Sequence, residues 1–254
     1  MSEARASDNV AGRAMFEAYI VKARREFTVE VELRLARGEC LALFGPSGAG
    51  KSTVLSCIAG FEAPDRGEIR LFDRRVFPPS APLYSRPLAY LTQKDLLFPH
   101  LTVGENVCFG LNGARVSAED DSRRAANADW IAELRRRLGL ERVWDAPARA
   151  ISGGQARRAA IARMLARRPP LVLLDEPFAS LDSLLIFDLV ELLLEWQASL
   201  NFALIAADHR RDILMRLCPR VAAIERGRIV QEGRWEELTA APATPTLLRL
   251  LAKS

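Results

Sequence analysis

One stretch of the chain alternates strictly between apolar and polar residues. In FTVEVELRL, residues 27–35, apolar side chains occupy every odd position from Phe27 to Leu35, and polar side chains occupy the even positions. Successive side chains of a strand point to opposite faces, so this period of two predicts a strand that is buried on one face only. Half-buried strands are typical of antiparallel sheets, and we expect antiparallel pairing here.

Four short runs are instead continuously apolar. They are CLALF at 40–44, LVLL at 171–174, ALIAA at 203–207 and VAAI at 221–224. Uninterrupted apolar runs of this length are typical of parallel strands that are covered on both faces. The pattern therefore predicts the central strands of an α/β sheet.

A helical period dominates the long region between the first two of these runs. ADWIAELRRRLGL, residues 128–140, places its large apolar side chains, from Trp130 to Leu138, on one stripe. Such a stripe is typical of an amphipathic helix that packs on a core. We therefore expect a helical subdomain at about 94–168, inserted into the sheet domain.

The two ends of the chain differ in character. Residues 1–14 are small and polar and lack the apolar segment of a signal peptide, so we expect a flexible tail. Residues 244–254, TPTLLRLLAKS, predict a short amphipathic helix. We expect the rest of the chain, residues 15–254, to form one domain.

Composition narrows the class of protein. The 254 residues are 49% hydrophobic, which is enough for a sizeable core. No uninterrupted apolar stretch approaches the roughly 20 residues of a membrane span. The formal charge is +4, but the arginines are dispersed over several predicted helices, so we expect a solvated surface and no nucleic-acid partner. The four cysteines form no CxxC pair, which argues against a zinc site and is typical of a reducing cytoplasm.

A glycine-rich motif follows the first apolar run. GPSGAGKST fits the pattern GxxxxGK[ST] and leads into STVLSCIAG, which predicts a helix ending at Gly60. A glycine turn that only packs a helix on a strand is the alternative. The complete pattern favours a phosphate site, because bare backbone N–H groups and the helix N-terminus point to one place. Lys51 is placed to reach the β and γ phosphates, and Ser52 to offer its hydroxyl to Mg²⁺. The predicted contacts are Gly45, Pro46, Ser47, Gly48, Ala49, Gly50, Lys51, Ser52 and Thr53.

Two acidic residues end the second apolar run. In LVLLDEP, Asp175 and Glu176 lie at the carboxyl end of a predicted buried strand, where α/β sheets open their ligand crevice. Asp175 is placed to hold Mg²⁺, and Glu176 to face the water that attacks the γ phosphate. Taken alone, two acids at this position are more often a helix N-cap, but the phosphate motif favours the site.

A second helix start also carries glycines. ISGGQARRAAIARMLARR, residues 151–168, places Ser152 as an N-cap, and its arginines, Arg157 among them, are expected largely on faces other than the apolar stripe. Gly153 and Gly154 would let another group approach the backbone. The alternative is a capped helix after a loop.

In this order and spacing the motifs resemble the ATP-binding cassette (ABC) family. GPSGAGKST, ISGGQ, LVLLDEP and ASLD, together with Gln93 and His209, carry the resemblance over about residues 16–235. It implies an α/β P-loop ABC ATPase fold, with a mixed parallel core sheet, an N-terminal antiparallel β subdomain and an inserted α-helical subdomain. It also implies ATP hydrolysis with Mg²⁺ as cofactor.

The resemblance further implies a dimer and a role for each motif. Two cassettes pair head to tail, and each ATP lies between the phosphate loop of one chain and the signature of the other. The signature residues here are Ser152, Gly153, Gly154 and Gln155. The implied catalytic residues are Lys51, Gln93 (the lid glutamine), Glu176 (the general base) and His209 (the switch histidine), the metal residues are Ser52, Gln93 and Asp175, and Asp182 is the D-loop aspartate.

Three positions depart from the family pattern. Ile151 replaces the usual leucine, a near-isosteric change of little expected effect. Asp208 precedes His209 where a small hydroxyl residue is common, which could alter the orientation of the histidine. Lys22 occupies the position of the aromatic residue that usually stacks on adenine, and Tyr19 and Phe27 are the nearby aromatic residues. The preference for ATP therefore rests on the resemblance.

The resemblance also suggests what the ATPase would move. LLFPHLTVGENV and DEPFASLD look most like the ATPase subunits of thiamine, iron and molybdate importers. It implies membrane permease subunits that dock on the helical subdomain beyond Gln93, where Leu96, Leu97, Phe98 and Leu101 gather. It further implies a second cassette, expected to be a copy of this chain, an extracytoplasmic solute-binding protein, and a peripheral location on the cytoplasmic face of the inner membrane.

Three alternative functions use the same pocket. The ATPase of an ABC exporter is separated poorly by sequence alone. A DNA-repair or chromosome ATPase would need a long coiled coil between the phosphate loop and the acidic strand, where this chain has no room for one. A translation-type ATPase normally carries two cassettes in one chain, and this chain shows one.

Overall fold

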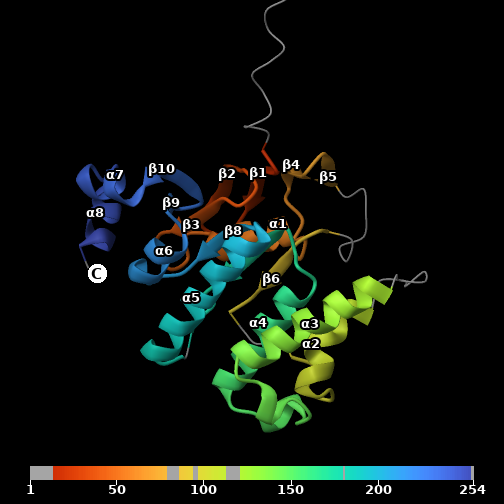
Figure 1. Ribbon diagram of the computed structural model, residues 1–254. Helices are drawn as coiled ribbons and strands as arrows, with labels where there is room; N and C mark the ends of the chain where they lie inside the picture. The colour runs from red at the N-terminus through yellow and green to blue at the C-terminus, as the bar shows by residue number, and fades with distance from the viewer. Residues whose placement is uncertain (1–13, 79–85, 94–96, 113–120, 180, 253–254) are drawn as a thin grey trace, which may run out of the picture.

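Strands from all parts of the chain form one mixed sheet (Figure 1). The strands are β1 (Phe16–Ala23), β2 (Thr28–Leu35), β3 (Cys40–Phe44), β4 (Arg66–Leu71), β5 (Arg74–Phe77), β6 (Ala89–Leu91), β7 (Leu171–Asp175), β8 (Ala203–Ala207), β9 (Arg220–Glu225) and β10 (Arg228–Arg234). The computed structural model describes residues 14–78, 86–93, 97–112, 121–179 and 181–252, and within them the sheet has ten strands in the order β5-β4-β1-β2-β10-β9-β3-β8-β7-β6. This mixed α/β architecture confirms the expected fold class.

Helices pack on both faces of the sheet (Figure 1). They are α1 (Lys51–Ala59), α2 (Val103–Asn112), α3 (Asp121–Arg137), α4 (Gly153–Ala166), α5 (Ser183–Leu200), α6 (Arg211–Leu217), α7 (Trp235–Ala240) and α8 (Pro245–Leu251), with short 3-10 segments η2 (Glu141–Val143) and η3 (Ala148–Ala150). Among the helices that the structure describes, none is both long and apolar enough to cross a membrane.

The strictly alternating stretch forms β2. β2 pairs antiparallel with β1 over its whole length, from Phe16 opposite Leu35 to Ala23 opposite Thr28. Its apolar side chains from Val29 to Leu35 are buried, and its polar side chains are exposed or half-buried. The predicted half-buried antiparallel strand is confirmed, because successive side chains of β2 point alternately to the core and to the solvent.

The continuously apolar runs form the parallel part of the sheet. β3 pairs parallel with β8 and β9, and β7 pairs parallel with β8 and β6. Every residue of β3, β7 and β8 is buried. The prediction of central parallel strands is therefore confirmed.

Two hydrophobic cores, one on each face, explain why these strands are apolar throughout. In β3, Leu41 and Leu43 join the core that also holds α1 and the inner faces of β1, β2 and β4. Ala42 and Phe44 of the same strand join the opposite core, which holds side chains of α4, α5 and α6. Neither face of the parallel strands meets water, so neither face selects polar residues.

Three helix ends follow local signals in the sequence. Gly60 ends α1 with φ of 87°, and its N–H donates to the carbonyls of Ser56 and Cys57. Ser152 starts α4 with a capping box that it shares with Gln155. Thr244 caps the N-terminus of α8. Each capping residue satisfies backbone groups that the helix itself leaves unpaired.

The helical region forms α2, α3 and α4, which lie side by side (Figure 1). Trp130 of α3 donates its indole N–H to the carbonyl of Leu165 in α4 at 3.0 Å, and Leu134 and Leu138 are fully buried. Their core is continuous with one face of the parallel strands. The expected start of the subdomain, at residues 94–96, and nearly all of the expected N-terminal tail lie outside the described residues, so these boundaries remain predictions.

Candidate functional site

A tight turn with two crowded glycine positions joins β3 to α1. A Cβ atom on Gly45 would lie 2.1 Å from the carbonyl oxygen of Ile224 in β9. Gly50 has φ of 105°, and a Cβ atom there would lie 2.9 Å from Val29 in β2. Only glycine fits both positions, because the turn is pressed against β9 at one end and β2 at the other.

The turn leaves the N-terminus of α1 open to a pocket. Gly50 is the N-cap and offers no side-chain acceptor, so the first N–H groups of the helix keep their donor capacity. Such a terminus attracts anions, because the helix dipole adds to the free N–H groups. The pocket has a volume of about 370 Å³ and is lined by Arg24, Arg25, Glu26, Phe27, Ser47, Gly48, Gly50, Lys51, Ser52, Thr53 and Glu176.

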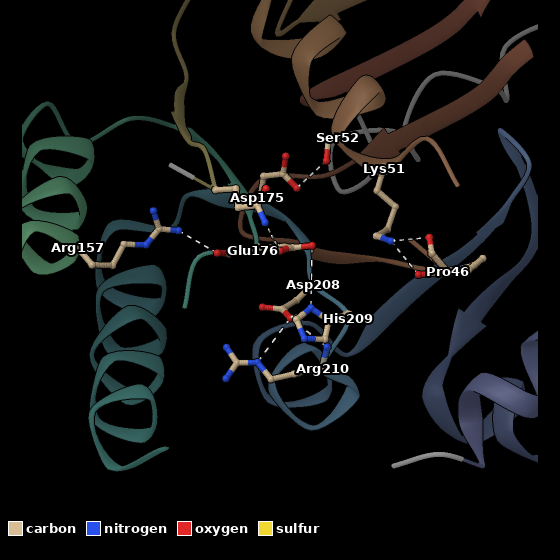
Figure 2. A network of polar contacts seen from close by, with 11 residues as sticks. Pro46, Lys51, Ser52, Arg157, Asp175, Glu176, Asp208, His209 and Arg210 are labelled. Atoms are coloured by element: carbon tan, nitrogen blue, oxygen red, sulfur yellow. Dashed lines mark hydrogen bonds and ion pairs between the residues drawn. The ribbon is translucent and has the colours of Figure 1, made fainter. Parts of the chain in front are cut away.

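Lys51 places a buried cation at this terminus (Figure 2). Its Nζ donates to the carbonyl oxygens of Gly45 at 2.8 Å and Pro46 at 3.0 Å. Burial lowers the pKa of the Lys51 ammonium, and the nearby carboxylates of Glu176, Asp175 and Asp208 oppose that shift.

Ser52 and Asp175 bring two hard oxygen ligands together. The Ser52 hydroxyl donates to Asp175 Oδ1 at 3.0 Å, and the Tyr90 hydroxyl donates to Asp175 Oδ2 at 3.1 Å. Within the described residues, no group of three or more His, Cys, Asp or Glu could hold a metal ion alone. Mg²⁺ needs no such group, because it is commonly bound by one or two protein oxygens together with phosphate oxygens and water. The pair therefore fits Mg²⁺ held beside a polyphosphate.

Glu176 has an unusual backbone conformation. Its φ is 46°, in the left-handed region that costs a non-glycine residue about 1–3 kcal/mol. Its N–H donates to the carbonyl of Ala207 at 2.8 Å, which ties it to β8. The amide of Gln93 donates to Glu176 Oε2 at 2.7 Å, so the structure brings these two predicted catalytic residues together.

His209 faces two carboxylates (Figure 2). Its Nδ1 lies 4.0 Å from Glu176 Oε1 and 3.4 Å from Asp208 Oδ1. Asp208 is 1% exposed, and its Oδ1 accepts a hydrogen bond from the backbone N–H of Arg210 at 3.0 Å. Asp208, which stands where the family commonly has a small hydroxyl residue, is thus a buried carboxyl group beside His209.

The structure separates Lys22, which occupies the usual position of the stacking aromatic residue, from the two nearby aromatic residues Tyr19 and Phe27. Lys22 forms ion pairs with Asp65 at 2.8 Å and Glu62 at 3.8 Å. Tyr19 lines a different hollow, on the outer face of β1. Phe27 is the aromatic residue that lines the pocket at α1 within the part of the chain that the structure describes, and its position there suits stacking.

Arg24 holds Thr53, the last residue of the glycine motif. Arg24 donates to the hydroxyl of Thr53 from Nε at 3.1 Å and from Nη2 at 2.8 Å. Arg24 also pairs with Glu62 at 2.5 Å. This network lies on the rim of the pocket, between β1 and α1.

The signature lies outside this pocket. Ser152 and Gly153 are exposed at the start of α4, and none of residues 152–155 belongs to the lining of the pocket among the described residues. Asp182 is also exposed and caps α5 by accepting from the N–H of Leu185 at 2.9 Å. The chain therefore has two helix N-termini with glycines, those of α1 and α4, and the pocket that contains Lys51 lies at the N-terminus of α1.

Sequence reasoning missed two polar residues near the site. Tyr90 reaches Asp175 from β6, and burial is the main cause that raises its pKa to about 12. Tyr90 lies opposite Leu173 of β7, a pairing that no local pattern in the sequence predicts. Arg157 was expected on a polar helix face, but it is 2% exposed and lies against the turn at Glu176 (Figure 2). No local pattern distinguishes it from the half-buried Arg158 and Arg163 of the same helix.

Comparison with known sequences gives consistent matches. A family model described as "ABC transporter" matches residues 29–179. The chain is 38% identical over 214 residues to the spermidine/putrescine import ATP-binding protein PotA of Bacillus cereus, covering 84% of this chain and 63% of PotA. It is 37% identical over 225 residues to the thiamine import ATP-binding protein ThiQ of Salmonella choleraesuis, covering 87% of this chain and 89% of ThiQ. The chain thus spans less than two thirds of PotA but most of ThiQ.

Comparison with solved structures agrees with the sequence matches. A dimeric ATP-binding cassette, in a post-hydrolysis state bound to ADP and Pi, superposes with a TM-score of 0.74 at 27% identity. The match covers 87% of this chain and 98% of that chain.

The packing of Gly45 can be tested by stability. Gly45→Ala should lower the free energy of unfolding by about 3 kcal/mol or more, because the new methyl group meets the Ile224 carbonyl of β9. Gly153→Ala is the matched control, since a Cβ atom there meets no atom within 4 Å. Thermal unfolding of both variants checks this. Equal melting temperatures for the two would contradict the close approach of the turn to β9.

Proposed function

The chain belongs to the ABC transporter family, and from that premise we propose that it is the ATP-hydrolysing subunit of a solute importer. PotA and ThiQ, the relatives named above, are import ATP-binding proteins. The matching dimeric cassette is bound to ADP and Pi. PotA is named for spermidine and putrescine and ThiQ for thiamine, and the cargo that we propose for this chain is a solute of the thiamine, iron or molybdate class.

One arrangement supports ATP hydrolysis above other functions. Lys51, Ser52 and Glu176 line a pocket at an open helix N-terminus, and Asp175 contacts Ser52 from the end of β7. A cation and free N–H groups suit the β and γ phosphates, and the Glu176 carboxylate in the same lining suits a proton acceptor.

The residues of this pocket divide the chemistry between them. Lys51 and the N–H groups of α1 bind the phosphates and stabilise the charge that develops on the transferred phosphoryl group. Glu176 takes a proton from the attacking water, while the bond between the γ phosphorus and the bridging oxygen of ADP breaks. Gln93 and His209 flank the Glu176 carboxylate and orient it and the water.

Ser52 and Asp175 are the residues that would hold Mg²⁺, because their oxygens already lie 3.0 Å apart. Bound there, Mg²⁺ would neutralise charge on the β and γ phosphates. Tyr90 would keep Asp175 oriented by donating to its second oxygen, at 3.1 Å.

A second copy of the chain would complete each site. Ser152 to Gln155 lie away from the pocket of their own chain, and their exposed helix N-terminus suits the γ phosphate of a nucleotide bound to a partner. Closure of two chains on ATP and their opening after hydrolysis would give the reversible motion that transport requires.

Membrane permease subunits would receive this motion at the helical region. Leu97, Phe98 and Leu101 are half-buried. The ring centroids of Phe98 and Phe109 lie 4.5 Å apart, and Phe109 is 51% exposed. Leu96, the remaining residue of the expected docking segment, lies outside the described residues. The system would include an extracytoplasmic solute-binding protein, and the chain would lie on the cytoplasmic face of the inner membrane.

Glu176→Gln tests the general base. The amide cannot accept a proton at neutral pH, so the rate of hydrolysis should fall by about 100-fold or more while ATP still binds. ATP should then trap a stable dimer, detectable by size-exclusion chromatography with light scattering. Hydrolysis at the parent rate would show that another group is the base.

Ser152→Arg and Lys51→Ala together test the shared site. Ser152→Arg should abolish hydrolysis but leave the affinity of the monomer for a fluorescent ATP analogue nearly unchanged, because Ser152 does not line the pocket of its own chain. Lys51→Ala should weaken that affinity directly, because Lys51 lines the pocket. An unchanged turnover in Ser152→Arg would contradict the shared site.

Affinity purification of the full chain from detergent-solubilised membranes tests import. We expect a permease and a solute-binding protein among the partners. Recovery of an exporter-type membrane protein without a binding protein would contradict import and leave the ATPase assignment intact.

A further inference from the structure

Arg157 is a buried cation one turn into α4, behind the signature. Its side chain is 2% exposed, although it is one of several arginines on this helix. A buried guanidinium is stable only where its N–H groups find acceptors, because transfer of a charge out of water is costly. Its partners therefore indicate what it does.

Three main-chain carbonyls accept hydrogen bonds from Arg157. Nη1 donates to Thr92 at 2.8 Å, and Nη2 donates to Glu176 at 2.9 Å. Nε donates to Pro177. Figure 2 shows the side chain extending from α4 to the turn at Glu176.

These carbonyls flank the contact between the lid glutamine and the base. Thr92 directly precedes Gln93, whose amide donates to Glu176 Oε2 at 2.7 Å. The carbonyl of Glu176 itself accepts from Arg157, in a turn where Glu176 has φ of 46°. One guanidinium thus holds the backbone on both sides of the Gln93–Glu176 contact.

The helix that carries Arg157 also carries the signature. Ser152 is the N-cap of α4, and a helix moves as a rigid unit over one turn. A displacement of the exposed end of α4 therefore acts on the carbonyls that Arg157 holds. The guanidinium fork suits this task, because its donors are planar and fixed relative to one another, whereas lysine offers one ammonium group.

We propose that Arg157 is a positioning residue that couples the signature helix to the general base of the same chain. Contact of Ser152 and its neighbouring glycines with the ATP of the partner would fix the position of α4. Arg157 would thereby fix the orientation of Glu176 and Gln93 toward the ATP of its own chain. The inference rests on the proposed ATPase function and adds a connection between the two shared sites.

Substitution of Arg157 should separate turnover from binding. Arg157→Gln should lower kcat by between about 10- and 100-fold, because a small misplacement of a catalytic group is costly. KM and the affinity for a fluorescent ATP analogue should stay within about twofold of the parent, because Arg157 does not line the pocket. Arg157→Lys, which keeps the charge, should retain more activity than Arg157→Gln.

Arg167→Gln is the matched control, because Arg167 is exposed at the other end of α4. It should hydrolyse ATP at the parent rate. A purely structural role for Arg157 would instead lower the melting temperature and ATP affinity together with kcat, and so a parallel fall of all three in both Arg157 variants would overturn the proposal. An unchanged kcat in Arg157→Gln would overturn it as well. Absence of hydrolysis by the parent chain would overturn the proposed function itself, and with it any role for Arg157 in that reaction.

Discussion

Parallel pairing of β3, β8 and β7 is the constraint on which the site depends. Ala207 of β8 lies opposite Leu43 of β3 on one side and Asp175 of β7 on the other. The backbone pairing therefore places the carboxyl ends of these three strands at the same edge of the sheet. Gly45, Glu176 and Asp208 follow directly after them. Side chains from distant parts of the sequence meet because parallel strands open at the same edge of a sheet.

Charge at this edge is arranged around one buried lysine. The carboxylates of Glu176, Asp175 and Asp208 all act on Lys51, whose ammonium is hydrogen-bonded to its own loop. Several acids near one cation would repel a polyphosphate if nothing offset them. The open N-terminus of α1, the cation of Lys51 and a Mg²⁺ ion at Ser52 and Asp175 together would supply that offset.

The main chain connects the motifs as much as the side chains do. Glu176 is held by a hydrogen bond from its N–H to Ala207, from β8, and by a hydrogen bond to its carbonyl from Arg157 of α4. A left-handed conformation at a non-glycine residue persists only where its surroundings enforce it. The turn that orients the Glu176 carboxylate is therefore held in place by β8, α4 and the segment before Gln93, and not by β7 alone.

Local sequence pattern determined most of the secondary structure discussed above, and packing between distant segments determined which side chains meet at the site. The alternation in β2, the apolar runs of β3, β7 and β8, and the caps of α1 and α4 could be predicted from sequence, because each depends on neighbouring residues. The glycine motif likewise indicated residues that line the pocket, among them Lys51, Ser52 and Thr53. Pattern could not identify Tyr90 as a partner of Asp175, place Phe27 and not Tyr19 in the lining of the pocket, or separate buried Arg157 from the other arginines of α4. Those outcomes depend on which strands pair and which carbonyls lie within reach, and both are set only when segments far apart in the chain come into contact.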